Sequence, residues 1–129
     1  RLPPGSPSAA KAREGGLSPL SPEAALTLIP RNMKPEGEGY VWQTDPRLRH
    51  PSPLMMTEEQ VLASLSAIET HVLFVRADAG LLSYRKDLDK RADAIANLQI
   101  VNVPGGHHCH LDGETGPAAI AIRQFLENE

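Results

Sequence analysis

Hydrophobic positions recur with helical spacing directly after residue 57. Thr57 and Gln60 have the spacing of a capping box, and the apolar positions that follow are Val61, Leu62, Leu65 and Ile68. This pattern predicts a helix over residues 58–69. The continuous apolar run Val72-Leu73-Phe74-Val75 comes next and predicts a strand that is covered on both faces, as in a parallel sheet.

Helical and strand patterns continue to alternate along the rest of the chain. A second helix is predicted over residues 87–98, a strand over residues 98–103, and a last helix that begins at Gly116-Pro117. Strands that alternate with helices form parallel sheets, so the pattern predicts an α/β fold. Two strands alone would leave backbone groups unpaired, so the pattern also predicts that further strands come from another segment.

Prolines divide the chain into two parts. Ten of the twelve prolines fall in residues 1–53, and this content predicts a mostly irregular first part. We interpret residues 1–53 as a cap or lid segment with its connection to the core. Residues 54–129 are interpreted as the core segment.

The first part still carries local signals of regular structure. Ser21 and Pro22 have the positions of an N-cap and a first-turn proline, and they predict a short helix that Pro30 ends. Residues 37–44 predict a turn and a short extended piece. We expect Tyr40 and Trp42 to belong to the core of the lid rather than to a substrate site.

Composition narrows the class of protein. A chain of 129 residues with 40% hydrophobic content can form a domain with a core. It has no run of 18 apolar residues and one cysteine, which favours a soluble cytoplasmic protein. The net charge of −3, with both signs interleaved, and the 4% aromatic content argue against nucleic-acid or membrane partners. A start at Arg1 without a signal-peptide pattern predicts a fragment or a processed piece.

The candidate chemistry lies in the stretch that follows the predicted strand over residues 98–103. Gly105-Gly106 permits a tight turn, and His107 comes directly after it. Reactive groups in α/β sheets lie in loops at the carboxyl ends of strands, so His107 is the candidate general base. A loop histidine that faces water or caps the next helix is the alternative.

The same stretch offers metal ligands, because His107, His108, Cys109 and His110 are adjacent. In an extended loop His108 and His110 would point one way and the other two residues the opposite way, so at most two would reach one ion. No second ligand group is apparent. We therefore expect neither a metal nor a cofactor, and we expect Cys109 to be a small buried neighbour of the site.

An acid should orient the general base. Asp78 lies just beyond the strand predicted over residues 72–75 and is the candidate catalytic acid. A turn aspartate before Gly80 is the alternative interpretation. Asp87 and Asp89 instead fit the acidic first turn of a helix.

Several segments together resemble the α/β-hydrolase superfamily, in particular serine hydrolase-like proteins with a cap domain. Residues 17–25 resemble the cap helix of that family, and residues 40–49 and 51–54 resemble the segment that joins cap to core. Residues 105–112 resemble its terminal histidine loop. The resemblance implies the C-terminal part of an α/β-hydrolase parallel sheet with flanking helices, preceded by a helical or irregular cap segment.

The resemblance makes His107 the triad histidine and His108 and His110 supporting loop residues. Family members often carry Gly-(Glu/Asp)-x-Asp after the preceding strand, whereas this chain has Ala77-Asp78-Ala79-Gly80 and so places Gly80 at the usual acid position. Three possibilities stay open. Asp78 acts from a shifted position, the acid lies outside this chain, or the triad is altered.

The triad order in this fold places the nucleophile far upstream of the histidine. No G-x-S-x-G occurs, and Gly15-Gly16-Leu17-Ser18 is followed by Pro19 where a glycine would be needed. The resemblance therefore implies the C-terminal portion of a hydrolase for an ester-like or related small molecule. Its Ser or Asp nucleophile would lie in an N-terminal half outside this chain, so the isolated chain would be inactive. A non-catalytic binding or degenerate hydrolase-like module is the alternative.

Overall fold

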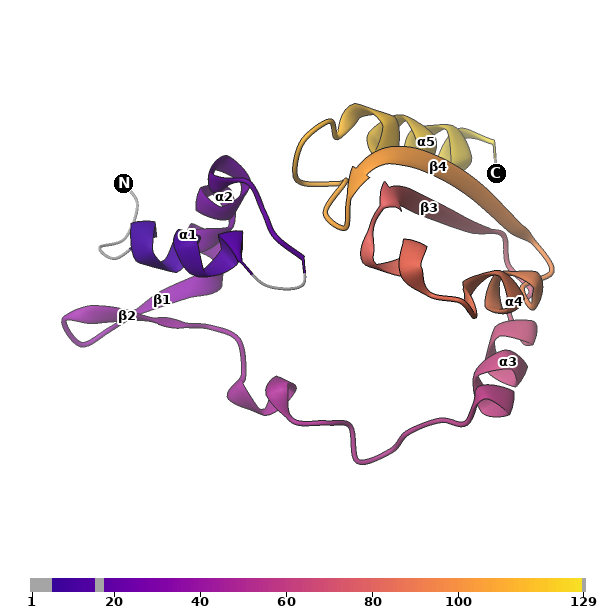
Figure 1. Ribbon diagram of the computed structural model, residues 1–129, viewed down its shortest axis with the longest axis horizontal. Helices are drawn as coiled ribbons and strands as arrows, with labels where there is room; N and C mark the ends of the chain where they lie inside the picture. The colour runs from indigo at the N-terminus through magenta and orange to yellow at the C-terminus, as the bar shows by residue number, and fades with distance from the viewer. Residues whose placement is uncertain (1–5, 16–17, 129) are drawn as a thin grey trace. The chain divides into compact units, whose positions relative to one another are not determined.

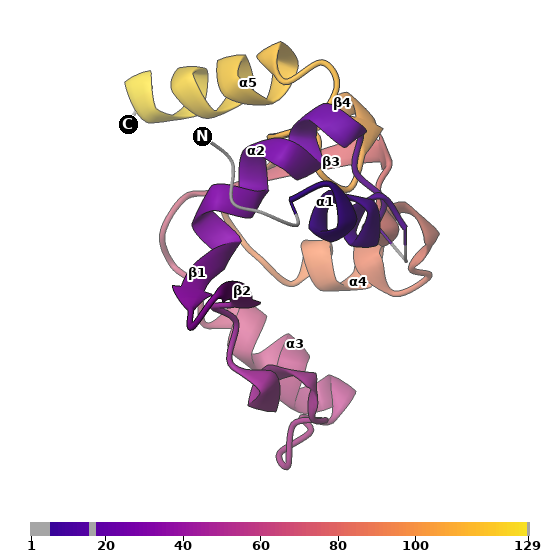
Figure 2. The ribbon, with the colours of Figure 1, turned by 90° about the vertical axis from the view of Figure 1, so that its left-hand side faces the viewer.

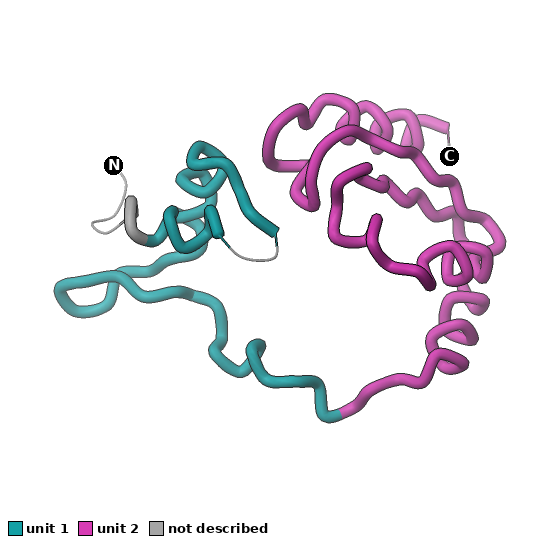
Figure 3. The backbone as a smooth tube through the Cα atoms, in the orientation of Figure 1, with its two compact units in different colours: residues 1–53 teal, residues 54–129 magenta. Residues whose placement is uncertain are grey.

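The computed structural model describes residues 6–15 and 18–128 and divides into two compact units, residues 1–53 and 54–129 (Figure 3). The boundary lies where prolines become rare in the sequence. Residues 1–5 and Leu17, which belong to the interpretations of the chain start and of the cap helix, lie outside the described residues. Within the described residues, no helix is long and apolar enough to cross a membrane.

The first unit is more regular than its proline content predicted. It contains helices α1 (Ser6–Glu14) and α2 (Pro22–Asn32), the antiparallel strands β1 (Met33–Glu36) and β2 (Gly39–Trp42), and the short 3₁₀ helix η1 (Pro46–Arg49) (Figure 1). Small side chains let α1 and α2 pack closely. Among the residues of this unit whose burial is described, the buried ones are Ala9, Ala10, Leu20, Ala24, Ala25 and Ile29.

Two expectations for this unit are wrong. Pro30 does not end α2, because it lies in the last turn, where it removes a single hydrogen bond, and the Met33 N–H still reaches the Ile29 carbonyl. Trp42 is not in the lid core, since it remains 36% exposed. The predicted cap is present: the Ser21 hydroxyl accepts a hydrogen bond from the Ala24 N–H at 3.2 Å.

The second unit has the predicted order of helices and strands. Its elements are α3 (Glu58–Ser66), β3 (Val72–Ala79), η2 (Leu81–Tyr84), α4 (Leu88–Asp93), β4 (Leu98–Gly106) and α5 (Gly116–Glu127). β3 and β4 are parallel neighbours, with Val72 opposite Leu98 and Ala77 opposite Val103. α5 lies on one side of this pair and α4 on the other (Figures 1 and 2). The α/β class with a parallel sheet and flanking helices is confirmed.

The ends of these elements differ from the predicted ones. The predicted helix over residues 87–98 is too long, because Asn97 already belongs to the strand alignment: its carbonyl accepts from the Val72 N–H at 2.9 Å, and its side chain donates to the Glu69 carbonyl at 2.8 Å. The helix expected to reach residue 69 ends at Ser66. Both strands are longer than predicted, so Asp78 lies within β3 rather than beyond it.

The core of the second unit is one face of the strand pair. Ala77, Val103, Cys109 and Ala118 are buried there, and Val75 and Val101 pack against them. Side chains alternate between the two faces of a strand, so Phe74 and its partner Ile100 point away from α5. Phe74 is half-buried and Ile100 is 41% exposed. The described chain therefore covers one face well, and the predicted burial of this strand on both faces is not seen.

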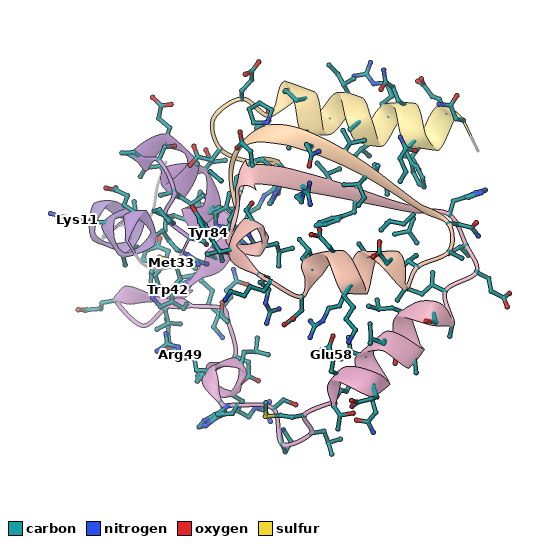
Figure 4. All side chains as sticks on the ribbon, turned by 45° about the vertical axis from the view of Figure 1, so that its right-hand side comes forward. Lys11, Met33, Trp42, Arg49, Glu58 and Tyr84 are labelled. Atoms are coloured by element: carbon teal, nitrogen blue, oxygen red, sulfur yellow. The ribbon has the colours of Figure 1, made fainter. Side chains whose placement is uncertain are left out.

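An ion pair joins α3 to α4. Arg91 donates from Nη2 to Glu58 Oε2 at 2.6 Å and from Nε to Glu58 Oε1 at 3.1 Å, and Glu58 is labelled in Figure 4. The hydrogen bond from Arg91 lowers the pKa of Glu58 below its ordinary value. Because the folded pKa is lowered, the pair stabilises the fold above the unfolded pKa, and this contribution is lost as pH falls through the folded pKa.

We expect Arg91→Met to raise the pKa of Glu58 toward its ordinary value. The variant should also lose the part of the free energy of unfolding that the ion pair contributes at neutral pH, so its stability should decrease less as the pH is lowered. The measurement is the NMR titration of the Glu58 carboxyl carbon. Lys90→Met is the control, because Lys90 precedes Arg91 on α4 and acts on Glu58 only as a weaker distant charge. An unchanged Glu58 titration in Arg91→Met would show that the ion pair does not persist in solution.

Candidate functional site

The carboxyl ends of β3 and β4 bring the two predicted site residues to the same end of the sheet. Asp78 lies near the end of β3, and its Oδ1 accepts a hydrogen bond from the Gly105 N–H at 2.9 Å. Ala79 is the strand partner of Gly106. His107 follows Gly106 directly, so the histidine loop begins beside the end of β3.

The histidine loop, residues 107–110, is a turn and not the extended segment considered for metal binding. The Cys109 N–H donates to the Gly106 carbonyl at 3.1 Å, and the Leu111 N–H donates to the His108 carbonyl at 2.8 Å. Gly105 has a φ of +109°, which side chains rarely tolerate. Cys109 is buried, as expected. It packs against Ala77 and Val103 and so attaches the loop to the core of the second unit.

The turn changes how the loop side chains are arranged. His107 and His110 are exposed and Cys109 is buried, so the alternation that an extended loop would produce does not occur. The His107 and His108 rings lie edge to face with centroids 5.1 Å apart, and the His108 and His110 centroids are 6.0 Å apart. Among residues 6–15 and 18–128, no group of three His, Cys, Asp or Glu side chains could hold a metal ion.

A pocket of about 190 Å³ opens beside the loop. His107, Cys109 and His110 contribute one wall, and residues 74–77 of β3 contribute another. The remaining lining residues are Gly80, Leu82, Ala118 and Ile122. A mostly apolar pocket with a few polar groups is the usual form of a small-molecule site, and here the polar lining residues include His107, His110 and Arg76.

Gly80, one of the residues that line this pocket, is tightly packed against its neighbours. A Cβ atom at this position would lie 3.2 Å from the Ala77 Cβ, 3.3 Å from the Ala77 oxygen and 3.7 Å from the His107 Cα. A side chain at position 80, where the family resemblance would place an acid, would therefore require Ala77 to shift by a few tenths of an ångström. Gly80 instead permits the end of β3 to lie against the histidine loop.

Asp78 contacts the backbone of the loop and not the ring of His107. Its carboxylate is bound to the Gly105 N–H, and in the described part of the chain no hydrogen bond joins Asp78 to His107. The observed geometry makes Asp78 a positioning residue for the loop. Its catalytic role stays a prediction.

Ser83 stabilises the turn that follows β3, a role that was not predicted from the sequence. Its hydroxyl donates to the Ala77 carbonyl at 2.7 Å, and its N–H donates to the Gly80 carbonyl at 3.0 Å. These bonds fix the turn between β3 and η2. The predicted end of the strand at Val75 placed Ser83 too far from the sheet for such a role to be apparent.

Comparison with known proteins identifies relatives that are longer than this chain. No protein-family model matches the chain. A serine hydrolase-like protein of Dictyostelium discoideum is 32% identical over 96 residues, which represent 70% of this chain and 26% of that protein. The chain thus spans about a quarter of the curated relative.

Solved structures share the fold. A hypothetical protein from Pseudomonas aeruginosa PAO1 matches with a TM-score of 0.81 and 35% identity, over 93% of this chain and 43% of that chain. The thioesterase domain from the curacin biosynthetic pathway matches with a TM-score of 0.69 and 24% identity, over 94% of this chain and 43% of that domain. The second likeness concerns the fold alone.

The thioesterase fold agrees with the α/β arrangement of the second unit. The name of the curated relative agrees with the resemblance to serine hydrolase-like proteins. The chain belongs to the α/β-hydrolase superfamily.

Proposed function

We propose that this chain supplies the general base, His107, of a hydrolase that acts on an ester-like or related small molecule. The observation that carries the proposal is the placement of His107. It is exposed, follows the carboxyl end of a parallel strand, and lines an apolar pocket. A general base must be able to reach its substrate while the surrounding loop holds it in position.

The nucleophile of the proposed reaction belongs to a segment outside these 129 residues. This chain spans about a quarter of its curated relative, which leaves ample sequence for a nucleophile-bearing half. A serine there would give its proton to His107 as it attacks the carbonyl carbon and forms an acyl-enzyme. His107 would return that proton to the leaving group and then take one from the water that releases the acid. An aspartate nucleophile would instead form an alkyl-enzyme, with His107 activating the water.

Asp78 supports this proposal through the backbone. Its hydrogen bond to the Gly105 N–H holds the start of the loop two residues before His107. A carboxylate that acts directly on the His107 ring would come from outside this chain or from a different Asp78 side-chain conformation. Either source leaves His107 as the base.

The walls contributed by this chain favour a small apolar substrate group. Ala118 and Ile122 of α5 lie across the pocket from β3, and the volume of about 190 Å³ suits a short acyl or alkyl group. In this proposal the N-terminal half of the protein supplies the remaining walls and the groups that stabilise the oxyanion.

The test is fluorophosphonate labelling of the full-length natural protein, together with hydrolysis of p-nitrophenyl acetate. We expect one labelled serine outside residues 1–129 of this chain, and loss of hydrolysis after labelling. Hydrolysis that persists without labelling would favour an aspartate nucleophile. A protein that is neither labelled nor hydrolytic would contradict the proposal.

A non-catalytic binding module is the second candidate. Gly80 favours it, because this residue supplies no carboxylate at the position where the family resemblance would place the acid, and a side chain there would press on Ala77. Such a module would keep the pocket beside His107 but bind its ligand without turnover. Saturable binding of an ester that remains intact would identify this case.

A further inference from the structure

The first unit contains a pocket that is independent of the histidine loop. Its volume is about 570 Å³, and α1, β2, η1 and the residues beside them provide the lining. The lining residues are Ala12, Arg13, Trp42, Thr44, Pro46 and Arg49. Two of these six carry positive charge, and no acidic residue is among them.

Arg13 is placed by its contact with Trp42. Its guanidinium carbon lies over the indole ring, 5.7 Å from the ring centroid. A cation–π contact uses the positive charge of the guanidinium, which also carries five N–H donors. Arg13 can therefore keep this contact and still donate to an oxyanion.

Arg49 is the second cation, and the nearby acid does not neutralise it. Asp45 is engaged by Arg47, whose Nη2 lies 2.6 Å from Asp45 Oδ2, and Asp45 also accepts from the Arg47 N–H at 2.9 Å. Among the described residues neither Arg13 nor Arg49 forms an ion pair. Trp42 and Arg49 are labelled in Figure 4, on β2 and η1.

The distribution of charge along the sequence favours an anion in this unit. Residues 1–53 contain seven Arg and Lys against five Asp and Glu, whereas residues 54–129 contain six against eleven. The net negative charge of the chain thus comes from its second part. An anionic ligand would meet a weakly positive first unit with two unpaired guanidinium groups in its pocket.

We propose that this pocket binds an organic anion with a flat apolar part. Its carboxylate or phosphate group is held by Arg13 and Arg49, because the planar guanidinium fork matches oxyanions of this shape. Its apolar part lies against Pro46 and the exposed surface of Trp42. This binding goes beyond the hydrolase proposal and requires no catalytic step.

Calorimetric titration of the full-length protein tests the proposal with three probes of similar shape. Phenylacetate and benzylphosphonate carry the two anionic groups, and phenylacetamide is neutral. We expect saturable binding of at least one anion and much weaker binding of the amide. The stronger of the two anions identifies the preferred group.

Variants connect the binding to this pocket. Arg49→Gln is expected to weaken binding of the preferred anion about tenfold, as for loss of a charged hydrogen-bond donor. Arg49→Lys keeps the positive charge but loses the planar guanidinium group. Its affinity for the preferred anion is expected to lie between that of Arg49→Gln and that of the unchanged protein. Arg31→Gln makes the same charge change on α2 outside the pocket and is expected to bind normally.

Three results would overturn the proposal. Neither anion binds saturably, the amide binds as well as the anions, or Arg49→Gln and Arg31→Gln weaken binding equally. Thermal unfolding of each variant verifies that it is folded. Arg13→Gln provides a second, independent replacement if Arg49→Gln does not fold.

Discussion

Replacing His107 by glutamine is expected to lower kcat/KM of the proposed hydrolysis by the full-length protein by about 10²- to 10⁴-fold, the usual contribution of a general base. Glutamine is similar in size and can still form hydrogen bonds, but it cannot take a proton from the nucleophile or from water. His107 is exposed at the surface of the loop, so the substitution should leave the fold intact. Initial rates with p-nitrophenyl acetate measure the loss.

His110→Gln is the matched control for this experiment. His110 lies in the same loop, is also exposed and lines the same pocket, but it is not the residue that follows the glycine pair. We expect its kcat/KM to stay within a few-fold of the unchanged protein. Equal losses in the two variants would mean that the loop as a whole, and not the His107 proton acceptor, is responsible.

Gly105→Ala is expected to destabilise the fold by about 1–3 kcal/mol, the cost of holding a residue with a side chain in a strained backbone region. The φ of +109° is the cause, since the added Cβ would meet only the Cys109 Cβ at an ordinary 3.8 Å. Relief of that strain would move the Gly105 N–H away from Asp78. Activity should therefore fall together with stability, and denaturant unfolding measures the latter.

The neighbouring glycine provides the comparison. No heavy atom lies within 4 Å of a Cβ built on Gly106, and its φ is not in the positive range. Gly106→Ala should change the free energy of unfolding by less than about 0.5 kcal/mol. If the two alanine variants were equally stable, the positive φ of Gly105 would not persist in solution.

Local signals were sufficient for much of the second unit. The Thr57 and Gln60 capping box is present in full, with the Thr57 N–H donating to Gln60 Oε1 at 2.9 Å. The last helix begins at Gly116-Pro117, as predicted. These features depend on residues three or four positions apart, so a single sequence contains what determines them.

The parts that the sequence did not predict depend on contacts between distant residues. The contact of Asp78 with Gly105 follows from the register of β3 against β4, which the residue types do not specify. Helix α4 stops at Asp93, well before Asn97, whose side chain donates to the distant Glu69 carbonyl. Trp42 remains partly exposed and lies against Arg13 of α1, a helix that the proline-rich sequence did not suggest.

The connection between β3 and β4 also affects the order of folding. The hydrogen bonds from Arg76 to Asn102 and from Gly105 to Asp78 join residues 26 and 27 positions apart. Contacts at such separation form after local helices, because a long loop must close first. A newly synthesised molecule should therefore acquire its helices early, and the segment that carries His107 should be among the last to become ordered.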